Sequence, residues 1–191
     1  SDGWGKTKNY SDGKKVENIE DLFFEYIRIL REIQPKVMVA ENVAGLVKGT
    51  AKGYFNEIMR ELKASGYHVE CKVLDAKWLG VPQSRNRTIF VGVRNDLYKP
   101  SMKLHPKPFG PLIGTGEAIN DLIHTREEIS DVDISSFSIY KLLVSLKAGE
   151  DHPKRFSLKK NHPKKPCHCI TATTGNLGAG NPCHWDNRAF T

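Results

Sequence analysis

The stretch VMVAENVAGL, residues 37–46, combines a strand pattern with a charged end. An apolar run ends abruptly in a carboxylate and an amide, Glu41 and Asn42, and a glycine follows at position 45. An unpaired buried carboxylate is costly, so a strand that only filled a core would not end in one. Open α/β sheets place their binding sites at the carboxyl ends of strands. The stretch therefore predicts a strand that delivers Glu41 to a site.

The first hundred residues alternate between helical and strand patterns. Apolar residues at helical spacing and a late proline or glycine mark two helices, whereas short apolar or alternating runs mark three strands. The second strand should pair in parallel with the first, and the third, which follows after a short loop, should run antiparallel to its neighbour. The expected elements are a helix over residues 16–33, a fully buried strand over 36–40, a helix over 51–65, and strands over 67–76 and 88–94.

Composition indicates a basic globular protein. The 191 residues include 29 Lys and Arg against 22 Asp and Glu, a formal charge of +7, which favours a polyanionic partner, nucleic acid first. No apolar run approaches the roughly 20 residues that span a bilayer, and no leader-like segment opens the sequence, so we expect a cytoplasmic protein that binds no membrane. Four scattered cysteines do not form a disulfide framework in a chain of this length.

A second chemical pattern opens the last expected strand. Gln83, Arg85 and Arg87 alternate along an extended segment, and side chains two residues apart lie on one face of a strand. Two guanidinium groups and an amide on one face suit an anion or a carbonyl oxygen of a planar base. A solvated basic edge is the alternative for the arginines when they are taken alone.

These two patterns in this order resemble the cytosine-C5 DNA methyltransferase family. The resemblance rests on "LFFEYIRILREIQPKVMVAENVAGL", on "GYHVECKVLDAKWLGVPQSRNRTIFVGVRNDL" and more loosely on "PCHCITATTGNLGAGNPCHWDNRAFT". It implies an α/β fold, part of a doubly wound Rossmann-like sheet that includes an antiparallel strand, with a small, irregular, mainly β target-recognition domain. We expect residues 1–110 to belong to the catalytic domain and residues 111–191 to the recognition domain.

The resemblance also implies roles for individual residues. In the family, a cysteine thiolate attacks C6 of a flipped-out cytosine, and S-adenosylmethionine then methylates C5. Glu41 matches the glutamate that binds the N3 and N4 edge of the base, and Arg87 matches the arginine that contacts O2. Asn42 and Val43 would shape the pocket, and Arg85 would support it.

Further positions are implied to hold the cofactor and the double-stranded DNA. Leu22 matches a leucine that packs on S-adenosylmethionine, and Thr171 matches a threonine that touches the DNA backbone. Lys6 and Lys8 lie in a basic opening segment that resembles a loop closing over DNA, where they would contact phosphates. Gln83, on the strand face shared with the arginines, is expected to contact the substrate.

The family's glycine-rich cofactor motif and its Pro-Cys nucleophile would precede Ser1. By resemblance the sequence is therefore a middle piece of a methyltransferase of the restriction-modification type, inactive alone and prone to associate with itself or with the rest of the enzyme. Two alternatives remain open: a transfer-RNA cytosine methyltransferase, and a non-catalytic DNA-binding protein of the same fold. Pro166-Cys167 and Pro182-Cys183 repeat the Pro-Cys pair, but in the wrong order relative to Glu41.

Two features of the remaining sequence are weak signals. Gly114-x-Gly116 could cradle a phosphate, but it follows no convincing strand. Zinc-ligand residue types gather near the end of the sequence, but their spacing matches none of the common zinc motifs, and we expect no metal. These residues are Cys167, His168, Cys169, Cys183 and His184.

Overall fold

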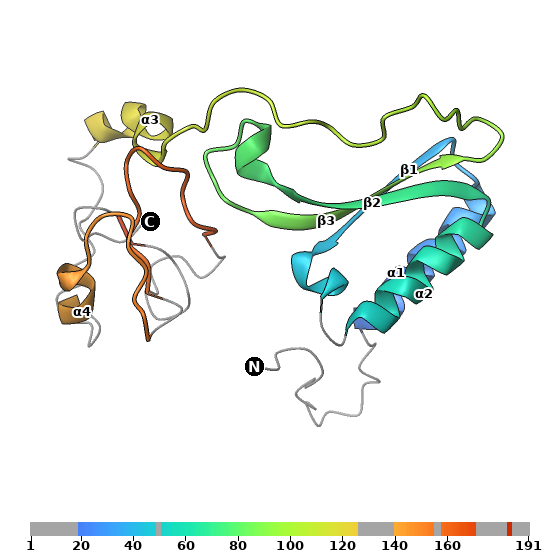
Figure 1. Ribbon diagram of the computed structural model, residues 1–191, viewed down its shortest axis with the longest axis horizontal. Coiled ribbons are helices and arrows are strands. Elements are labelled where there is room, and N and C mark those ends of the chain that lie inside the picture. The colour runs from blue at the N-terminus through green and yellow to red at the C-terminus, as the bar shows by residue number, and fades with distance from the viewer. Residues whose placement is uncertain (1–18, 49–50, 126–139, 155–157, 171–182, 185–191) are drawn as a thin grey trace. The chain divides into compact units, whose positions relative to one another are not determined.

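The computed structural model describes residues 19–48, 51–125, 140–154, 158–170 and 183–184 (Figure 1). The chain divides into two compact units, which are described separately. The first comprises Ser1–Val73 and Arg87–Pro106, and the second comprises Leu74–Asn86 and Lys107–Thr191. Among the described residues, no helix is long and apolar enough to cross a membrane.

A three-stranded sheet and two helices organise the first half of the chain, as the sequence predicts. The strands lie in the order β1-β3-β2, and the last residues of β2 and the first of β3 belong to the second unit. The elements are α1 (Ile19–Ile33), β1 (Val37–Val43), the short 3₁₀ helix η1 (Ala44–Val47), α2 (Lys52–Ala64), β2 (Tyr67–Asp75), the 3₁₀ helix η3 (Ala76–Leu79) and β3 (Asn86–Arg94).

The strand β3 lies at the centre of the sheet and is antiparallel to both neighbours. It pairs with β1 so that Val43 faces Arg87 and Val37 faces Val93. Toward β2, the Asn95 amide donates to the Gly66 carbonyl at 2.9 Å, and the Ala76 amide donates to the Arg85 carbonyl at 3.2 Å. Residue numbers therefore decrease along β3 from Asn95 to Arg85 while they increase along β2 from Gly66 to Ala76, which is the mark of antiparallel strands. The antiparallel prediction is confirmed. The predicted parallel pairing of β1 with β2 is wrong, because the short loop after β2 returns β3 between them.

One face of the sheet packs against α1 and α2, which lie side by side (Figure 1). Phe90 of β3 is fully buried at the centre, with its ring 5.2 Å from that of Phe23 and 6.0 Å from that of Phe55. Further apolar residues complete this core. They stand at helical spacing on α1 and α2 and at alternate positions on the strands, so each periodic pattern in the sequence marks the face of its element that is buried. The buried members are Phe23, Ile27, Leu30, Met38, Leu46, Ile58, Leu62, Tyr67, Val69 and Phe90.

The strand β1 is half-buried rather than fully buried, which corrects the sequence prediction. Met38 is 3% exposed, but its neighbours Val37 and Val39 are 53% and 61% exposed. The alternation arises because β1 is an edge strand and because the two helices cover only one face of it within the described residues. The same one-sided packing leaves Leu22 and Ile33 of α1 exposed, although both fit the helical spacing.

Gly66 ends α2 as the sequence predicts. Its φ of +93° lies in the left-handed region that favours glycine, and its amide donates to the Lys63 carbonyl at 3.1 Å. Helix α1 ends at Ile33, and Gln34 follows with a φ of +49°, its amide bonded to the Leu30 carbonyl. Pro35 comes next, where it stops the helix as predicted.

Beyond residue 106, the described part of the second unit is irregular, as predicted, but its β structure there consists of isolated bridges rather than a sheet. It contains α3 (Thr115–Ala118), the 3₁₀ helix η4 (Asn120–Thr125) and α4 (Tyr140–Ser145). Bridges join Gln83 to Cys167, Asp151 to Lys159 and Lys160 to Cys183. The sequence CHCITATT, residues 167–174, suggests a strand. The structure shows one bridge there, at Cys167, and residues 171–174 lie outside the described part. A small core gathers Leu143, Leu146, Leu158 and Cys183.

Candidate functional site

Glu41 and Arg87 form an ion pair where β1 ends and β3 begins. The Nε atom of Arg87 lies 2.5 Å from Oε1 of Glu41. Because Val43 faces Arg87 in the register, Glu41 and Arg87 project from the same face of the sheet, which α1 and α2 do not cover. The Glu41 side chain is 55% exposed and that of Arg87 is 24% exposed. The structure therefore brings together two of the predicted site residues, and the carboxylate stays accessible to a ligand.

Asn42 and Val43 hold the end of β1 in place. The Oδ1 atom of Asn42 accepts a hydrogen bond from the Val43 amide at 2.8 Å. The Val43 carbonyl accepts a second from the hydroxyl of Thr88 at 3.1 Å, and Thr88 is fully buried. Thr88 was not predicted as a site residue, because a threonine on the covered face of a strand gives no signal beyond ordinary strand preference.

Gln83 and Arg85 belong to the second unit, where they lie beside residues 167–169. Main-chain hydrogen bonds of 2.8 Å join the Ser84 amide to the Cys167 carbonyl and the Cys167 amide to the Pro82 carbonyl. The Nη1 atom of Arg85 lies 3.3 Å from the Sγ atom of Cys169. The prediction that Gln83, Arg85 and Arg87 project together stays a prediction, because Arg87 belongs to the other unit.

Asp75 is a residue that the sequence analysis missed. Its carboxylate accepts hydrogen bonds from the Arg85 amide at 2.9 Å, from the Ser84 hydroxyl at 3.0 Å and from the Lys77 amide at 3.3 Å. It thus lies between the two ends of the loop that joins β2 to β3. A usable signal was present: an aspartate directly before a short helical turn that ends at Gly80 is a typical N-terminal cap.

Of the four remaining predicted residues, the structure describes only Leu22. Leu22, on the exposed side of α1, is 57% exposed, so its side chain is accessible to an apolar ligand group. Lys6, Lys8 and Thr171 lie outside the described residues.

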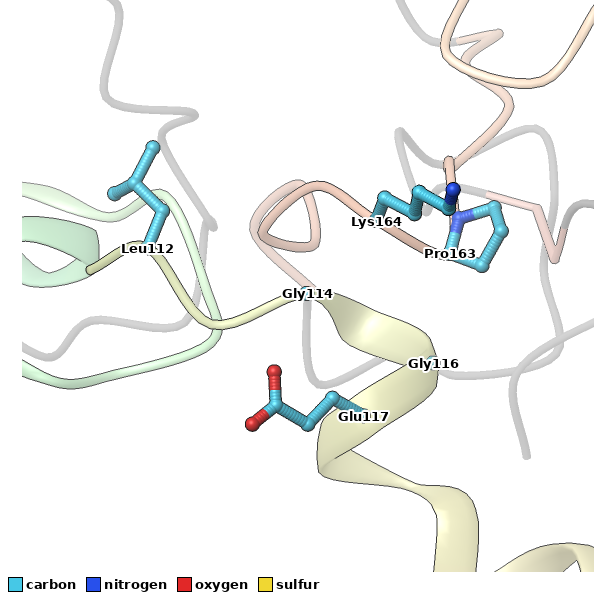
Figure 2. Close-up of a pocket in the computed structure, with 6 residues that line it drawn as sticks. All are labelled: Leu112, Gly114, Gly116, Glu117, Pro163 and Lys164. Carbon is cyan, nitrogen blue, oxygen red and sulfur yellow. The ribbon is translucent and has the colours of Figure 1, made fainter.

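Gly114 and Gly116 are explained by close packing rather than by a phosphate site. They line an open cavity of about 360 Å³ together with Leu112, Glu117, Pro163 and Lys164 (Figure 2). A Cβ atom on Gly114 would lie 2.5 Å from the Pro163 carbonyl oxygen, so only glycine fits. The Gly116 amide donates to that same carbonyl at 2.8 Å. An amide that is already bonded within the chain is not available to a phosphate.

Two of the cysteines of the second unit, Cys167 and Cys183, are buried free thiols. Burial raises the pKa of the Cys167 thiol to about 11, and Nδ2 of Asn161 lies 3.0 Å from its sulfur. Cys183 is fully buried, and its carbonyl accepts from the Asn161 amide at 2.9 Å. Within the described ranges, no group of three or more His, Cys, Asp or Glu side chains is arranged to hold a metal ion.

Comparison with solved structures identifies the fold. A crystal structure described as a DNA modification methyltransferase encoded within an E. coli prophage superposes with a TM-score of 0.62. It matches 90% of this chain and 60% of its own, at 18% sequence identity. At that identity the likeness establishes the fold alone, which is the Rossmann-like α/β fold of methyltransferases.

Sequence relatives give the family. The type II methyltransferase M.BspRI of Lysinibacillus sphaericus is 41% identical over 106 residues, which are 53% of this chain and 25% of that protein. M.Bsp6I of Bacillus sp. strain RFL6 is 31% identical over 175 residues, which are 90% of this chain and 54% of that protein. The chain thus spans between a quarter and about half of these relatives. The family model for C-5 cytosine-specific DNA methylases matches residues 4–171, and the chain therefore belongs to this family of enzymes, which use S-adenosylmethionine.

Proposed function

We propose that the protein to which this chain belongs is a DNA (cytosine-5-)-methyltransferase of a restriction-modification system. It would transfer the methyl group of S-adenosylmethionine to C5 of a cytosine flipped out of double-stranded DNA. Residues 1–110 would form part of its catalytic domain, and residues 111–191 would form part of the domain that recognises the target sequence. The observation that carries the proposal is the Glu41–Arg87 pair, exposed at the end of β1 in a chain of this family.

The chemistry of this pair suits a cytosine. A carboxyl group at the N3 and N4 edge can accept a hydrogen bond from the exocyclic amine and share a proton with N3. A guanidinium beside it can donate to the O2 carbonyl while it neutralises the carboxylate. A proton shared with N3 stabilises the electron-rich ring that forms when a thiolate adds to C6, so Glu41 would act where charge develops.

Other described residues would support this site. Asn42 and Val43 fix the end of the strand that carries Glu41. Gln83 and Arg85 are proposed contacts to the substrate, and the segment that carries them is held by residues 167–169. Lys6, Lys8 and Thr171 are proposed contacts to the DNA backbone.

For the cofactor, Leu22 is the one position that we propose. The adenosine of S-adenosylmethionine has an apolar face, and an exposed leucine beside a buried helix face can pack on it. The cofactor would supply the methyl group, and Leu22 would contribute to binding and orienting it.

We further propose that this chain alone does not transfer a methyl group. The reaction requires a thiolate. Cys183 is fully buried, and burial raises the pKa of both Cys71 and Cys167 to about 11. The fourth cysteine, Cys169, follows a histidine and not the proline of the family's nucleophile motif. The strand β1 lies at the edge of the sheet, so its outer backbone groups are suited to pairing with a further strand, and its exposed valines Val37, Val39 and Val43 are suited to being covered, either by the rest of the enzyme or by a second copy. Analytical ultracentrifugation of the chain would detect self-association.

The decisive experiment measures base preference in binding. The chain is titrated with a duplex that carries a mismatched, easily flipped cytosine, and with a matched duplex that carries thymine at the same position, across a salt series. We expect tighter binding to the cytosine duplex and a steep fall in affinity with salt, because phosphate contacts release counterions. Equal binding to both duplexes would contradict a cytosine pocket, and tighter binding to structured RNA would favour the transfer-RNA enzyme.

A further inference from the structure

Asp75 joins both ends of the loop between β2 and β3. Its Oδ1 atom accepts from the Arg85 amide at 2.9 Å, and its Oδ2 atom accepts from the Ser84 hydroxyl at 3.0 Å. On the other side of the loop, Oδ1 also accepts from the Lys77 amide, and the Lys77 ammonium lies 3.2 Å from Oδ2. One carboxylate therefore fixes the amide of Arg85, which lies ten positions further along the sequence.

This carboxylate is nearly buried and is saturated with donors. Its side chain is 11% exposed. Burial by itself would raise the pKa of Asp75, but the hydrogen bonds from Lys77, Ser84 and the Arg85 amide outweigh burial, and its pKa lies below the usual value. Hydrogen bonds to an ionised acceptor are the stronger kind, so the contact with the Arg85 amide is a firm one.

The backbone of Arg85 is held from two sides. Its amide donates to Asp75, and its carbonyl accepts from the Ala76 amide at 3.2 Å. The preceding residues are fixed by the bonds of Pro82 and Ser84 to Cys167, which are 2.8 Å each. A backbone fixed in this way limits the directions in which the Arg85 and Gln83 side chains can point.

We propose that Asp75 is a positioning residue, which fixes the backbone that carries the proposed substrate contacts Arg85 and Gln83 and does not touch the base itself. The inference rests on the proposed function, because Arg85 and Gln83 are substrate contacts only if that function holds. Independently of that function, we expect the Asp75 carboxylate to keep the backbone at Arg85 in one conformation.

The alternative is that Asp75 only stabilises its loop. If that is its whole role, removal of Asp75 should lower the free energy of unfolding and leave the base preference unchanged. A positioning residue would alter the ratio of affinities for cytosine and thymine duplexes, while affinity for an ordinary paired duplex, which depends on phosphate contacts, stays the same.

The test uses the full 191-residue chain. Asp75→Ala removes all the acceptors, and Asp75→Asn keeps one neutral oxygen that can accept from the Arg85 amide. Asp96→Ala is the matched control, since Asp96 accepts two bonds from Arg94, at 2.7 and 3.0 Å, at the far end of β3. Two quantities are measured for each variant: amide hydrogen exchange at Arg85, and the ratio of affinities for the mismatched cytosine and thymine duplexes.

In Asp75→Ala we expect hydrogen exchange at the Arg85 amide to be faster by roughly tenfold or more, because that amide loses its hydrogen bond to a charged acceptor. We expect the cytosine preference to fall by a similar factor, Asp75→Asn to lie between this variant and the wild type, and Asp96→Ala to match the wild type. Unchanged exchange at Arg85, or faster exchange with an unchanged cytosine preference, would overturn the proposal.

Two further results are also decisive. If Asp75→Ala does not fold, Asp75→Asn decides: exchange at the Arg85 amide no faster than in the wild type, or full cytosine preference, refutes the proposal. If the wild-type chain shows no cytosine preference, the proposed function fails, and the exchange at Arg85 alone then shows whether Asp75 orders this backbone.

Discussion

Arg87 and Glu41 lie on one face of the β1–β3 pair, with the guanidinium Nε atom 2.5 Å from the carboxylate. The Glu41 side chain is more than half exposed, and exposed ion pairs contribute only about 0–1 kcal/mol to folding. Stability is therefore a poor explanation for a carboxylate at the end of an apolar strand. An accessible carboxylate with a fixed orientation is what a binding pocket needs.

In a methyltransferase that contains this chain, Glu41→Gln should lower turnover by roughly 10²–10³-fold, because the amide cannot share a proton with the ring as charge develops. Affinity for duplex DNA should change less than about threefold, since Glu41 makes no phosphate contact in this proposal. Single-turnover kinetics and DNA titrations measure the two effects. Glu32→Gln, which removes an exposed carboxylate from α1, is the control and should change neither. Equal losses of turnover and affinity would instead make Glu41 a binding or folding residue.

Two leucines on α1 should respond oppositely to truncation. Leu30 is 4% exposed in the core, and Leu30→Ala should lower the free energy of unfolding by about 2–5 kcal/mol. Leu22 is 57% exposed, so Leu22→Ala should cost less than about 0.5 kcal/mol while it weakens S-adenosylmethionine binding in the enzyme. Urea unfolding and calorimetric titration measure these quantities. Loss of stability without loss of cofactor affinity in Leu22→Ala would remove Leu22 from the cofactor site.

Local pattern determines most of what the sequence predicts correctly. The helical spacing around Phe23 and Ile27, the glycine at position 66 and the alternation in β2 each depend on neighbours in the chain, so α1, α2, β2 and β3 are predicted close to their observed bounds. The ion pair between Arg87 and Glu41 was not predicted, because it depends on the register of β1 with β3. The errors concern tertiary structure. The position of β3 between β1 and β2 and the exposure of one face of β1 do not depend on local periodicity, so the sequence pattern did not reveal them.

The contacts missed from the sequence are of the same kind. Asp75 meets Arg85 across a loop, and Thr88 meets the Val43 carbonyl across a strand pair. A single sequence shows that these residues can accept or donate, but their partners become visible only when register and loop path are fixed.

Stability should fall as the solution is acidified, in part because of His105. This side chain is 7% exposed, and neither ring nitrogen has a hydrogen-bond partner within the described residues. Burial lowers the pKa of His105 below its usual 6.5, and nearby Lys72 acts in the same direction while Glu70 opposes it. The unfolded chain therefore binds the proton more readily, so the contribution is fully present above pH 6.5 and is lost as the pH falls below it.

Urea unfolding at pH 7.5 and pH 5.5 tests this effect in the wild type and in His105→Leu. The variant should lose part of the pH dependence. A remainder is expected from His168, whose pKa is lowered by burial and by Lys159 despite its contact with Asp151 at 3.4 Å. An identical pH dependence in both proteins would show that His105 is not a source of the effect.

Cys167 should be almost unreactive in the folded chain, although Pro166-Cys167 repeats the Pro-Cys pair of the family's nucleophile. It is 5% exposed, and burial raises the pKa of its thiol to about 11, so about one thiol in a thousand is ionised at pH 8. Iodoacetamide reacts with the thiolate. Peptide mass spectrometry should therefore find Cys167 modified at least about tenfold more slowly in the native chain than in the same chain unfolded in urea.

Cys71, whose pKa is also raised to about 11 by burial, should behave likewise and serves as the internal control. Fast native modification of Cys167 with slow modification of Cys71 would mean that Cys167 is an activated thiol, and a reaction that uses it as the nucleophile would then have to be considered.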